Sequence, residues 1–402
     1  MRTSPSKLAC ARRSWQGRDA WSLGNGLVDL TILRGGGHIA DFHFAKESGL
    51  PGLNPLWVPP WKTIDPDRYR PEVHAHTYGP PITGRMVAGI AGHNLCLDYF
   101  GAPSGEEAKQ GLSIHGEAPC LAWKKMGGQT TAKEAKLKLG VRLPVAGLRF
   151  EREMTMRRGE PVVYFKETVI NEKKADHFFH WVEHVTLGPP FLERDHSRIF
   201  VSARRGQTFP HGYEGKELLE SSRDFRWPHA PGMDGRAVDI SQPFTHPGLG
   251  FVVTLQLDPR REMEFVAALN IRHRLLIGYC FRRQDFPWMA IWEENKARTD
   301  APWHGKTQAR GLEFGSTPFP VGRREAFSRG PVFGAPSFSE VPARGRRSVD
   351  YVSFLAEVPA DLVRVADIHP GAGGILVRGS TKQGKARTIR VPAAGLTNAG
   401  LG

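Results

Sequence analysis

The clearest pattern of apolar and polar positions runs through residues 148–187. Within 148–156, apolar residues alternate with charged or hydroxyl residues, and this period of two predicts a half-buried β-strand. A turn with Gly and Pro at 158–161 leads into residues 162–170, where β-branched and aromatic side chains predict a second strand. A third strand is predicted at 177–187. Three successive strands joined by short turns predict an antiparallel meander.

Shorter segments of the same kind recur along the chain, with no long helical period and no internal repeat. The other predicted strands are 26–33, 38–42, 250–257, 264–268, 275–281, 288–292, 309–314 and 349–355. The 45 glycines and 31 prolines fit many short strands separated by turns. Residues 45–84 are rich in proline and predict a long excursion over the surface. The pattern therefore predicts an all-β protein.

The chain divides into one large domain with two basic ends. Its 402 residues are 40% hydrophobic, which is enough for a sizeable core and too much for a disordered chain. We expect a flexible basic arm at 1–20, a single β domain at 21–375 and a loop-like basic tail at 376–402.

The formal net charge of +14 has two interpretations. A basic surface can attract acidic ligands, nucleic acid or membranes, or it can be a solvated surface with basic ends. We favour the second interpretation, because no RNA-binding signature and no helix-turn-helix pattern accompanies the charge.

The four cysteines, Cys10, Cys96, Cys120 and Cys280, are far apart and form no CxxC pair. This spacing favours free thiols in a reducing compartment over a zinc cluster or a disulfide framework. The first fifteen residues lack the apolar stretch of a signal peptide, and no run reaches membrane-spanning length. We therefore expect a cytoplasmic protein.

Two histidines stand out on the third predicted strand. His180 and His184 are four residues apart, so that in a strand they point to the same face, whereas Glu183 points to the other face. This arrangement fits a binding or catalytic pair. It also fits two histidines that are satisfied within a polar rim.

Glu313 lies in an open stretch of a predicted strand. Leu312 and Phe314 face one side, which we expect to be core, and Glu313 faces the other side between Gly311 and Gly315. A carboxylate whose same-face neighbours have no side chains can meet a ligand that approaches the backbone. The alternative is a surface glutamate beside a glycine bulge.

A loop or strand-end histidine and a cluster of aromatic residues complete the candidates. His115 precedes Gly116 at an apparent strand end, although a lone histidine is more often a loop residue. The aromatic residues before Glu313 are Phe286, Trp288, Trp292 and Trp303. Tryptophan rings pack on sugar rings and donate to hydroxyl groups, but core packing is their commoner role.

The sequence gives little indication of a cofactor. His74 and His76 have the i, i+2 spacing of a metal site on a strand, as in cupin-type proteins, but no third ligand is visible. The glycines at 371–374 lack the strand-to-helix context of a dinucleotide loop, and a Gly-x-Ser-x-Gly nucleophile motif is absent. We expect neither a metal nor a cofactor.

Taken in order, these segments resemble the aldose 1-epimerase (galactose mutarotase-like) family over residues 25–370. Residues 148–192 resemble the family's central segment, in which an alternating strand and a strand ending in Asn precede the strand of a catalytic His, here His184. His115 with Gly116 resembles the family's substrate-binding His-Gly. Glu313, followed by Pro and Phe at 318–319, is similar to the family's catalytic Glu segment.

The resemblance implies a fold and a set of roles. The fold would be a large antiparallel β-supersandwich with a cleft for an aldose. His184 would act as the acid and Glu313 as the base. The further candidates for substrate binding are His115, His180, Arg85, Asp285 and Trp288. The Pro-rich segment 49–81 departs from the family pattern, and Arg85 and Asp285 are only candidate counterparts of its binding Arg and Asp.

Three functions follow from these observations. The first is an enzyme of the aldose 1-epimerase type that interconverts sugar anomers by acid–base ring opening. The second is a non-catalytic carbohydrate-binding protein with the same fold, and the third is a cupin-like metalloprotein. We expect a monosaccharide or sugar derivative as the partner, and neither nucleic acid nor a membrane.

Overall fold

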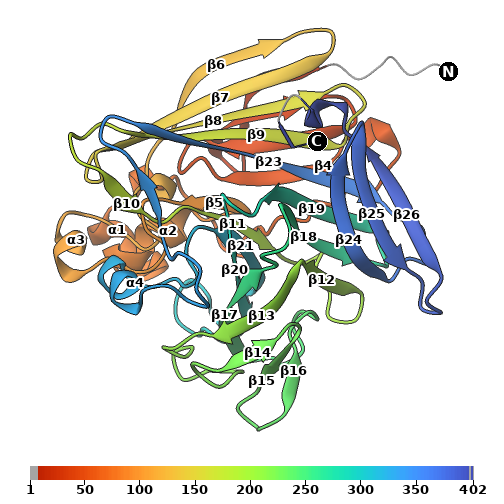
Figure 1. Ribbon diagram of the computed structural model, residues 1–402. Coiled ribbons are helices and arrows are strands. Elements are labelled where there is room, and N and C mark those ends of the chain that lie inside the picture. Colours follow the sequence, from red (N-terminus) through yellow and green to blue (C-terminus); the bar gives the residue numbers. More distant parts are fainter. Residues whose placement is uncertain (1–7, 398–399, 402) are drawn as a thin grey trace.

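A computed structural model describes residues 8–397, 400 and 401 as two large antiparallel sheets packed face to face (Figure 1). In spatial order, the first sheet consists of β1 (Ala9–Trp15), β2 (Arg18–Gly24), β3 (Val28–Leu33), β4 (Ile39–Phe44), β5 (His93–Cys96), β11 (Val182–Leu187), β21 (Gln308–Gly315), β20 (Trp288–Asn295), β17 (Leu249–Leu257), β13 (Ala203–Thr208), β14 (Asp224–Arg226), β15 (His229–Pro231) and β16 (Ala237–Asp239). The second consists of β12 (Ser197–Val201), β18 (Met263–Asn270), β19 (Leu275–Arg282), β23 (Arg346–Glu357), β9 (Val162–Asn171), β8 (Leu148–Arg157), β7 (Glu134–Leu143) and β6 (Lys124–Thr130). The predicted all-β class is confirmed.

The main core lies between these two sheets. Leu95 and Phe314 of the first sheet belong to the same buried cluster as Phe150 and Tyr351 of the second. A second cluster covers the outer face of β18, β19 and β23, where the small sheet β24 (Arg364–Gly371), β25 (Gly374–Ser380) and β26 (Ala386–Pro392) packs. Because β19 is covered on both faces, its sequence is a continuous apolar run without alternation.

The predicted meander is correct for its first two strands and wrong for the third. β8 and β9 pair antiparallel as expected, but the chain then forms the short strand β10 (His177–Phe179), which pairs with β22 (Ser339–Val341). The strand is interrupted at residues 180–181, and the chain then crosses into the first sheet, where β11 lies between β5 and β21. All six residues of β11 are buried, so that no alternation in the sequence reveals which sheet it joins.

The structure differs from the expectation at both ends of the chain. The arm predicted at 1–20 contains β1 and β2, which pair over seven residues, and residues 1–7 lie outside the described part. β1 is an edge strand with mostly exposed side chains, and for this reason its composition resembles that of a flexible arm. The tail predicted at 376–402 contains β25 and β26, so the β domain extends beyond residue 375.

Residues 45–84 were expected to be an irregular excursion, and the structure agrees for residues 49–65 but shows helices in much of the rest of 45–89. Residues 45–89 contain η1 (Lys46–Ser48), η2 (Pro66–Arg68), α1 (Pro71–Tyr78) and α2 (Pro81–Gly89). Proline is favoured at the first helical position, where its missing N–H would have no partner, and both α1 and α2 begin in this way. Together with α3 (Gly105–Lys109) and α4 (Arg323–Arg329), α1 and α2 lie on one side of the molecule beside β5, β11 and β21 (Figure 1). η2 and η3 (Ala118–Cys120) contact α2.

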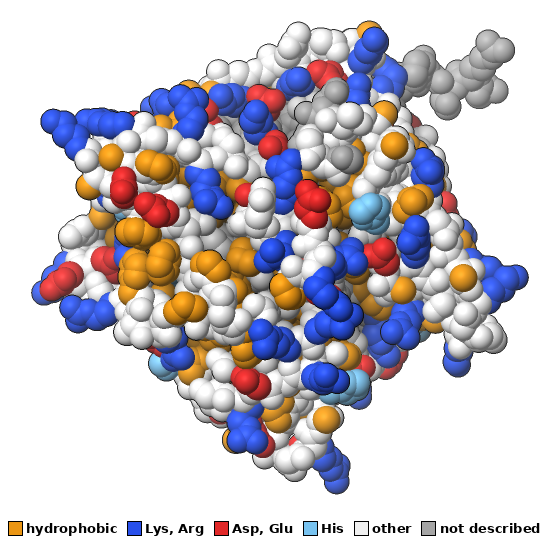
Figure 2. All heavy atoms as spheres, in the orientation of Figure 1, with side chains coloured by type: hydrophobic (Ala, Val, Ile, Leu, Met, Phe, Trp, Pro, Cys, Tyr) orange, Lys and Arg blue, Asp and Glu red, His pale blue; other side chains and the backbone are white. Residues whose placement is uncertain are grey.

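On one face of the molecule the positively charged side chains are dispersed. On the face shown in Figure 2, Lys and Arg side chains are scattered among acidic and apolar ones. Of the helices in the described part of the chain, none combines the length and the apolar character needed to cross a membrane.

Candidate active site

Four neighbouring strands of the first sheet place the candidate residues in one row. Asn94 of β5, His184 of β11, Glu313 of β21 and Ala290 of β20 lie directly opposite one another in the strand register. Residues directly opposite in antiparallel strands point to the same face. The side chains of His184 and Glu313 accordingly meet, with 3.1 Å between His184 Nε2 and Glu313 Oε1.

Glu313 is a buried residue, so the alternative of a surface glutamate is wrong. It is 3% exposed, and its side chain lies over Gly311, where a Cβ atom would come within 2.1 Å of Glu313 Oε1. The absence of a side chain at Gly311 is therefore required, because the carboxyl group of Glu313 occupies the space that a side chain would fill. Although His184 is close, Glu313 Oε1 has no aligned hydrogen-bond partner among the described residues. A buried oxygen in this state is available to a ligand.

His184 is oriented by its own strand. It is 4% exposed, and its Nδ1 lies 3.1 Å from the hydroxyl of Thr186, so that Nε2 is left facing Glu313. Burial lowers the pKa of His184 well below its usual value, with a smaller contribution from His115, and burial raises the pKa of Glu313 well above its usual value. Both directions favour the uncharged forms, a neutral imidazole beside a carboxylic acid.

His115 approaches this pair from a loop. Its backbone has φ of +68°, and the neighbouring Gly116 must be glycine because a Cβ atom there would lie 2.2 Å from Leu97 O. His115 Nδ1 donates to the carbonyl of Phe100 at 2.6 Å, which leaves Nε2 as the acceptor of a neutral ring. Burial lowers the pKa of His115 to about 4. Its ring centre is 5.1 Å from that of His184.

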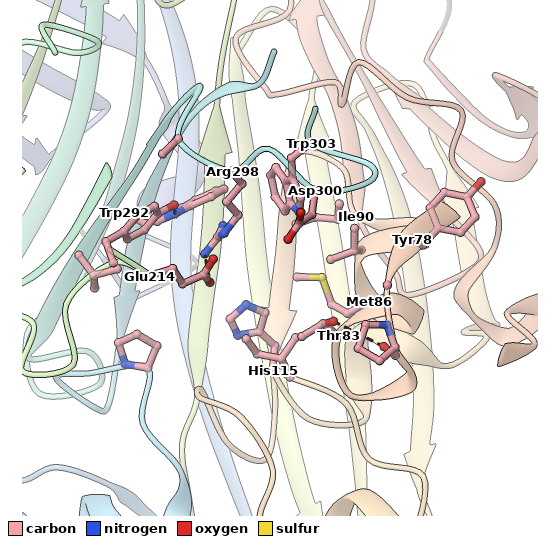
Figure 3. A pocket seen from close by; sticks show the side chains of 18 of the residues that line it. Tyr78, Thr83, Met86, Ile90, His115, Glu214, Trp292, Arg298, Asp300 and Trp303 are labelled. Carbon is pink, nitrogen blue, oxygen red and sulfur yellow. Dashed lines mark hydrogen bonds and ion pairs between the residues drawn. The ribbon is translucent and has the colours of Figure 1, made fainter. Parts of the chain in front are cut away.

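These groups open into a cavity of about 490 Å³. Figure 3 shows His115 between two walls, with Trp292 and Arg298 on one side and Met86 and Ile90 on the other. His184 and Glu313 line the same cavity. Cavities of roughly 300–1,000 Å³ with a few converging polar groups commonly bind small molecules.

Aromatic rings surround Arg298 at the first of these walls. Its guanidinium carbon lies 4.9 Å from the ring centre of Tyr213, 5.0 Å from Trp303 and 5.9 Å from Trp292. The only hydrogen bond from the Arg298 side chain within the described residues is a long one of 3.5 Å, to Glu214 (Figure 3). Arg298 Nη1 also lies 3.8 Å from the buried Glu294 carboxylate. The donors that these two acidic groups leave unused are available to an oxygen-rich ligand.

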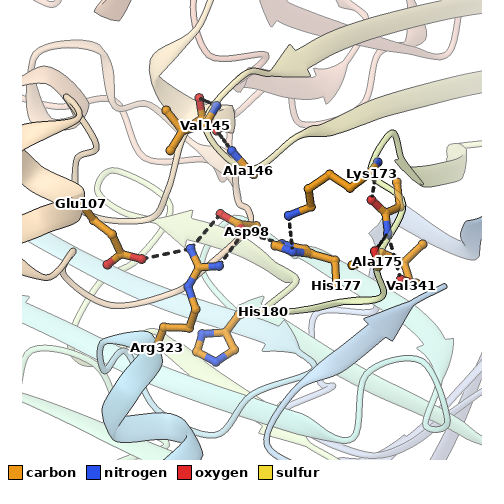
Figure 4. A network of polar contacts seen from close by, with 12 residues as sticks. Asp98, Glu107, Val145, Ala146, Lys173, Ala175, His177, His180, Arg323 and Val341 are labelled. Carbon is orange, nitrogen blue, oxygen red and sulfur yellow. Dashed lines mark hydrogen bonds and ion pairs between the residues drawn. The ribbon is translucent and has the colours of Figure 1, made fainter. Parts of the chain in front are cut away.

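A buried polar network behind the cavity supports His115 (Figure 4). The Asp98 carboxylate accepts hydrogen bonds from His177 at 2.7 Å and from Arg323 at 3.0 Å. The Asp98 carbonyl accepts from the backbone N–H of His180, and the Phe100 N–H donates to His180 Nδ1 at 3.2 Å. Residues 98–100 are thereby fixed on both sides, and they carry the carbonyl that orients His115.

Asp98→Asn is expected to lower the free energy of unfolding at pH 7 by roughly 2–3 kcal/mol, because a buried charged acceptor is lost. Burial alone would raise the pKa of Asp98, but His177 and Arg323 outweigh it and lower the pKa below its usual value. A lowered pKa stabilises the fold above the unfolded value of about 4, and this stabilisation is lost as the pH falls. Urea unfolding should show a difference between the two proteins that is large at pH 7 and shrinks below pH 4.

The exposed Asp234 offers a matched control, since Asp234→Asn should be nearly neutral at both pH values. A deficit of the Asp98 variant that is the same at pH 7 and at pH 3.5 would contradict the role of its charge.

The structure brings together three of the residues predicted from the sequence and places four elsewhere. His184, Glu313 and His115 line one cavity. His180, Arg85, Asp285 and Trp288 are not among its lining residues.

Each of the four residues outside the cavity has another neighbour. His180 lies between the end of β10 and the start of β11 rather than on one strand with His184. Its Nδ1 accepts a hydrogen bond from the Phe100 N–H. Arg85 of α2 donates to Gly111 O, and the nearest cation to Asp285 is Arg347 at 3.9 Å. Trp288 shares the face of Glu313 but lies two pairs along the strand, where its indole donates to Pro336 O.

Sequence reasoning found Trp292 and Trp303 only as members of a cluster and did not find Arg298 or Met86. Trp292 of β20 is opposite Gly311, two pairs from the pair with Glu313, and Trp288 lies equally far on the other side, so the strand register alone does not select one tryptophan over the other. Arg298 lies in the loop after β20, and Met86 lies in the second half of α2, beyond the segment 45–84 that was expected to be irregular. No periodicity in the sequence marks either of them.

The cupin-like alternative rested on a strand, and this premise is wrong. His74 and His76 lie in α1, where residues two apart point in different directions. His74 Nδ1 accepts a hydrogen bond from the backbone N–H of Arg70. In the part of the chain that the structure describes, no group of three or more His, Cys, Asp or Glu could hold a metal ion.

Comparison with solved structures identifies the architecture. The chain is similar to a candidate aldose 1-epimerase from Klebsiella pneumoniae, with a TM-score of 0.62 and 13% sequence identity over 87% of this chain and 82% of that one. It is also similar to a galactose mutarotase-like protein from Clostridium acetobutylicum, with a TM-score of 0.58 and 12% identity over 88% and 99% of the two chains. The chain has a galactose mutarotase-like fold.

A third similar structure is a galactose mutarotase related enzyme from Lactobacillus acidophilus, with a TM-score of 0.52 and 12% identity over 84% of this chain and 98% of that one. No protein-family model matches the chain, and no curated protein matches it in sequence. At 10–13% identity, the galactose mutarotase-like likeness concerns the fold and not the activity.

Proposed function

We propose that the protein is an aldose 1-epimerase-like enzyme that interconverts the anomers of a sugar. The observation that carries this proposal is the approach of His184 Nε2 to within 3.1 Å of Glu313 Oε1, in a cavity where that oxygen has no aligned hydrogen-bond partner. Mutarotation needs one group that removes a proton and one group that supplies a proton at neighbouring oxygens of one ring. An adjacent imidazole and carboxyl group meet that requirement.

The proposed reaction is a pair of coupled proton transfers. Glu313 takes the proton of the anomeric hydroxyl, the bond between the anomeric carbon and the ring oxygen breaks, and His184 gives its proton to the ring oxygen. After rotation about the adjacent carbon–carbon bond, the hydroxyl formed from the ring oxygen attacks the other face of the aldehyde. His184 then recovers its proton and Glu313 returns the other, so both residues end as they began.

The environment of the pair supports these exchanges. The two forms that the reaction requires, an ion pair and a neutral pair, differ only by the position of protons between the two residues and the sugar. Burial favours the neutral pair by raising the pKa of Glu313 and lowering that of His184. A ligand with hydroxyl groups at the pair offsets this preference by hydrogen bonding to the charged forms. His115 presents an unprotonated Nε2 that can accept from a further sugar hydroxyl.

The proposal predicts that the wild-type protein accelerates the approach to anomeric equilibrium of freshly dissolved α-glucose or α-galactose. Polarimetry, or magnetization-exchange NMR between the anomeric protons, measures this rate directly. His184→Asn should reduce the protein-dependent rate by about 10²–10⁴-fold, because the proton donor is lost. Catalysis that survives in His184→Asn would contradict the assignment of His184.

Carbohydrate binding without turnover is the second candidate. The observation in its favour is that Arg85 and Asp285, the candidate counterparts of the family's binding Arg and Asp, lie outside the cavity. Calorimetry and polarimetry together distinguish the two functions, since a pure binding protein would bind a sugar saturably in the calorimeter and leave its rate of mutarotation unchanged in the polarimeter.

A further inference from the structure

The cavity has two unlike walls, and the groups that can act on a sugar ring lie on one of them. The sheet wall carries His184, Glu313 and Trp292. The opposite wall comes mainly from α2, the end of α1 and the loop before His115, and its polar side chains Tyr78 and Thr83 donate their hydroxyl protons to backbone carbonyls. The apolar residues that line it are Met86, Val87, Ile90, Phe100 and Ile114. Figure 3 shows Met86 and Ile90 across the cavity from Trp292.

The cavity is also large for a monosaccharide. Its volume of about 490 Å³ falls in the range of roughly 300–1,000 Å³ typical of sites for drug-sized ligands. A sugar placed with its anomeric carbon next to His184 and Glu313 lies against the sheet wall, across the cavity from Met86 and Ile90 of the opposite wall (Figure 3). An apolar wall cannot satisfy sugar hydroxyls, and a hydroxyl buried against it without a hydrogen bond is costly.

The helical wall is built rigidly. A Cβ atom on Gly84 would lie 2.1 Å from Gly79 O, and one on Gly89 would lie 2.2 Å from the ring of Pro66. The Tyr69 hydroxyl donates to Gly79 O at 2.6 Å and fixes the turn that joins α1 to α2. Met86 is 2% exposed even though it lines the cavity. The apolar surface is therefore preformed, which reduces the entropic cost of binding to it.

We propose that the ligand is a sugar with a free anomeric hydroxyl and an apolar substituent elsewhere on the ring, which packs against Met86, Val87 and Ile90. The orientation of the sugar rests on the proposed function, because the anomeric hydroxyl must reach Glu313 and His184. The substituent therefore occupies a position other than the anomeric oxygen. Its apolar character follows from the lining of the wall alone.

The test compares the affinity of the wild-type protein for D-glucose and for its 2-, 3-, 4- and 6-O-benzyl ethers, all of which keep the anomeric hydroxyl. Titration calorimetry should show that at least one ether binds about 10–100-fold more tightly than glucose, as expected for burying one aromatic group. If no ether binds more tightly than glucose, the proposal is overturned.

Two variants locate the preference. Met86→Ala should reduce the ratio of ether affinity to glucose affinity several-fold, whereas Met126→Ala, at an exposed methionine of β6, should preserve the ratio. Ile114→Ala is a second variant at a half-buried position of the same wall, and it remains informative if Met86→Ala does not fold. A ratio that is unchanged in every folded wall variant would overturn the proposal.

Anomer exchange is measured separately on the same ligands. A preference for an ether without any exchange would refute the enzymatic function and leave the apolar subsite intact. Exchange of glucose together with no preference for any ether would refute the subsite and leave the enzymatic function intact.

Discussion

Glu313→Gln is expected to slow protein-dependent anomer exchange by about 10²–10⁴-fold while the fold remains intact. Glutamine has nearly the same shape and can still hydrogen-bond a sugar hydroxyl, but it cannot accept a proton as a carboxylate does. Sugar affinity should fall far less than the rate, because His115 and Trp292 also line the cavity and contribute to binding. The comparison requires an aldose that the wild-type protein converts, followed by polarimetry and by calorimetry.

The stability of this variant carries separate information. Burial raises the pKa of Glu313, and a raised pKa means that stability present below the unfolded value of about 4.5 is lost as the pH rises. Glutamine has no proton to lose, so the free energy of unfolding at pH 7 should stay equal or increase. A group that lowers stability while serving the reaction fits a functional site.

Glu262→Gln, in the exposed turn between β17 and β18, is the matched control and should change neither rate nor stability. Equal exchange rates for the wild-type protein and Glu313→Gln would remove Glu313 from the mechanism. A large loss of stability at neutral pH would instead indicate a structural carboxylate.

The central pair could be predicted from the sequence because both residues lie on strands. Glu313 stands between two glycines, and Leu312 and Phe314 on the opposite face belong to the main core as expected. The order of the His184 and Glu313 segments along the chain matches a known fold, and β11 and β21 are neighbours in that fold. At His184 and Glu313, the pattern of apolar and polar residues within each strand and the order of the two segments along the chain therefore led to the same prediction.

The opposite wall of the cavity could not be predicted in the same way. Met86 and Ile90 reach the site through two short helices that begin at prolines and contain glycines, and such residues also indicate an irregular loop. Arg298 depends on a loop conformation that Glu294 fixes by accepting from two backbone N–H groups, those of Ala297 and Arg298. These positions follow from tertiary contacts and not from any local pattern.

The buried face of β11 shows a second limit of sequence reasoning. Glu183 points away from the cavity, as the strand geometry predicts, but it points into the core between the sheets rather than to solvent. Its carboxylate accepts hydrogen bonds from Arg152 at 2.8 Å and from the Trp181 indole at 3.0 Å, and His93 Nε2 lies 2.8 Å away. These buried contacts connect β5, β8 and β11 directly behind the row that contains His184 and Glu313.

Arg152→Met is expected to lower the free energy of unfolding by about 3–5 kcal/mol, the usual cost of leaving one member of a buried ion pair without its partner. Arg152 is fully buried and binds both Glu167 and Glu183. Burial raises the pKa of Glu167 to about 8, so at neutral pH this residue is mainly a neutral acid and Arg152 is the cation that balances Glu183. Methionine fills much of the same space, so the loss reports on charge rather than on a cavity. Urea unfolding followed by tryptophan fluorescence measures it.

Two comparisons separate the buried pair from a general effect of removing arginine. Arg142→Met breaks an exposed pair with Glu172, in which the arginine side chain is 75% exposed, and should cost no more than about 1 kcal/mol. The double variant Arg152→Met/Glu183→Gln removes both charges of the buried pair and should be more stable than Arg152→Met alone, because no unpaired charge remains in the core. If the double variant is the less stable of the two, the two residues contribute independently through packing. In that case the ion pair between Arg152 and Glu183 would not be the interaction that holds β11 against the second sheet.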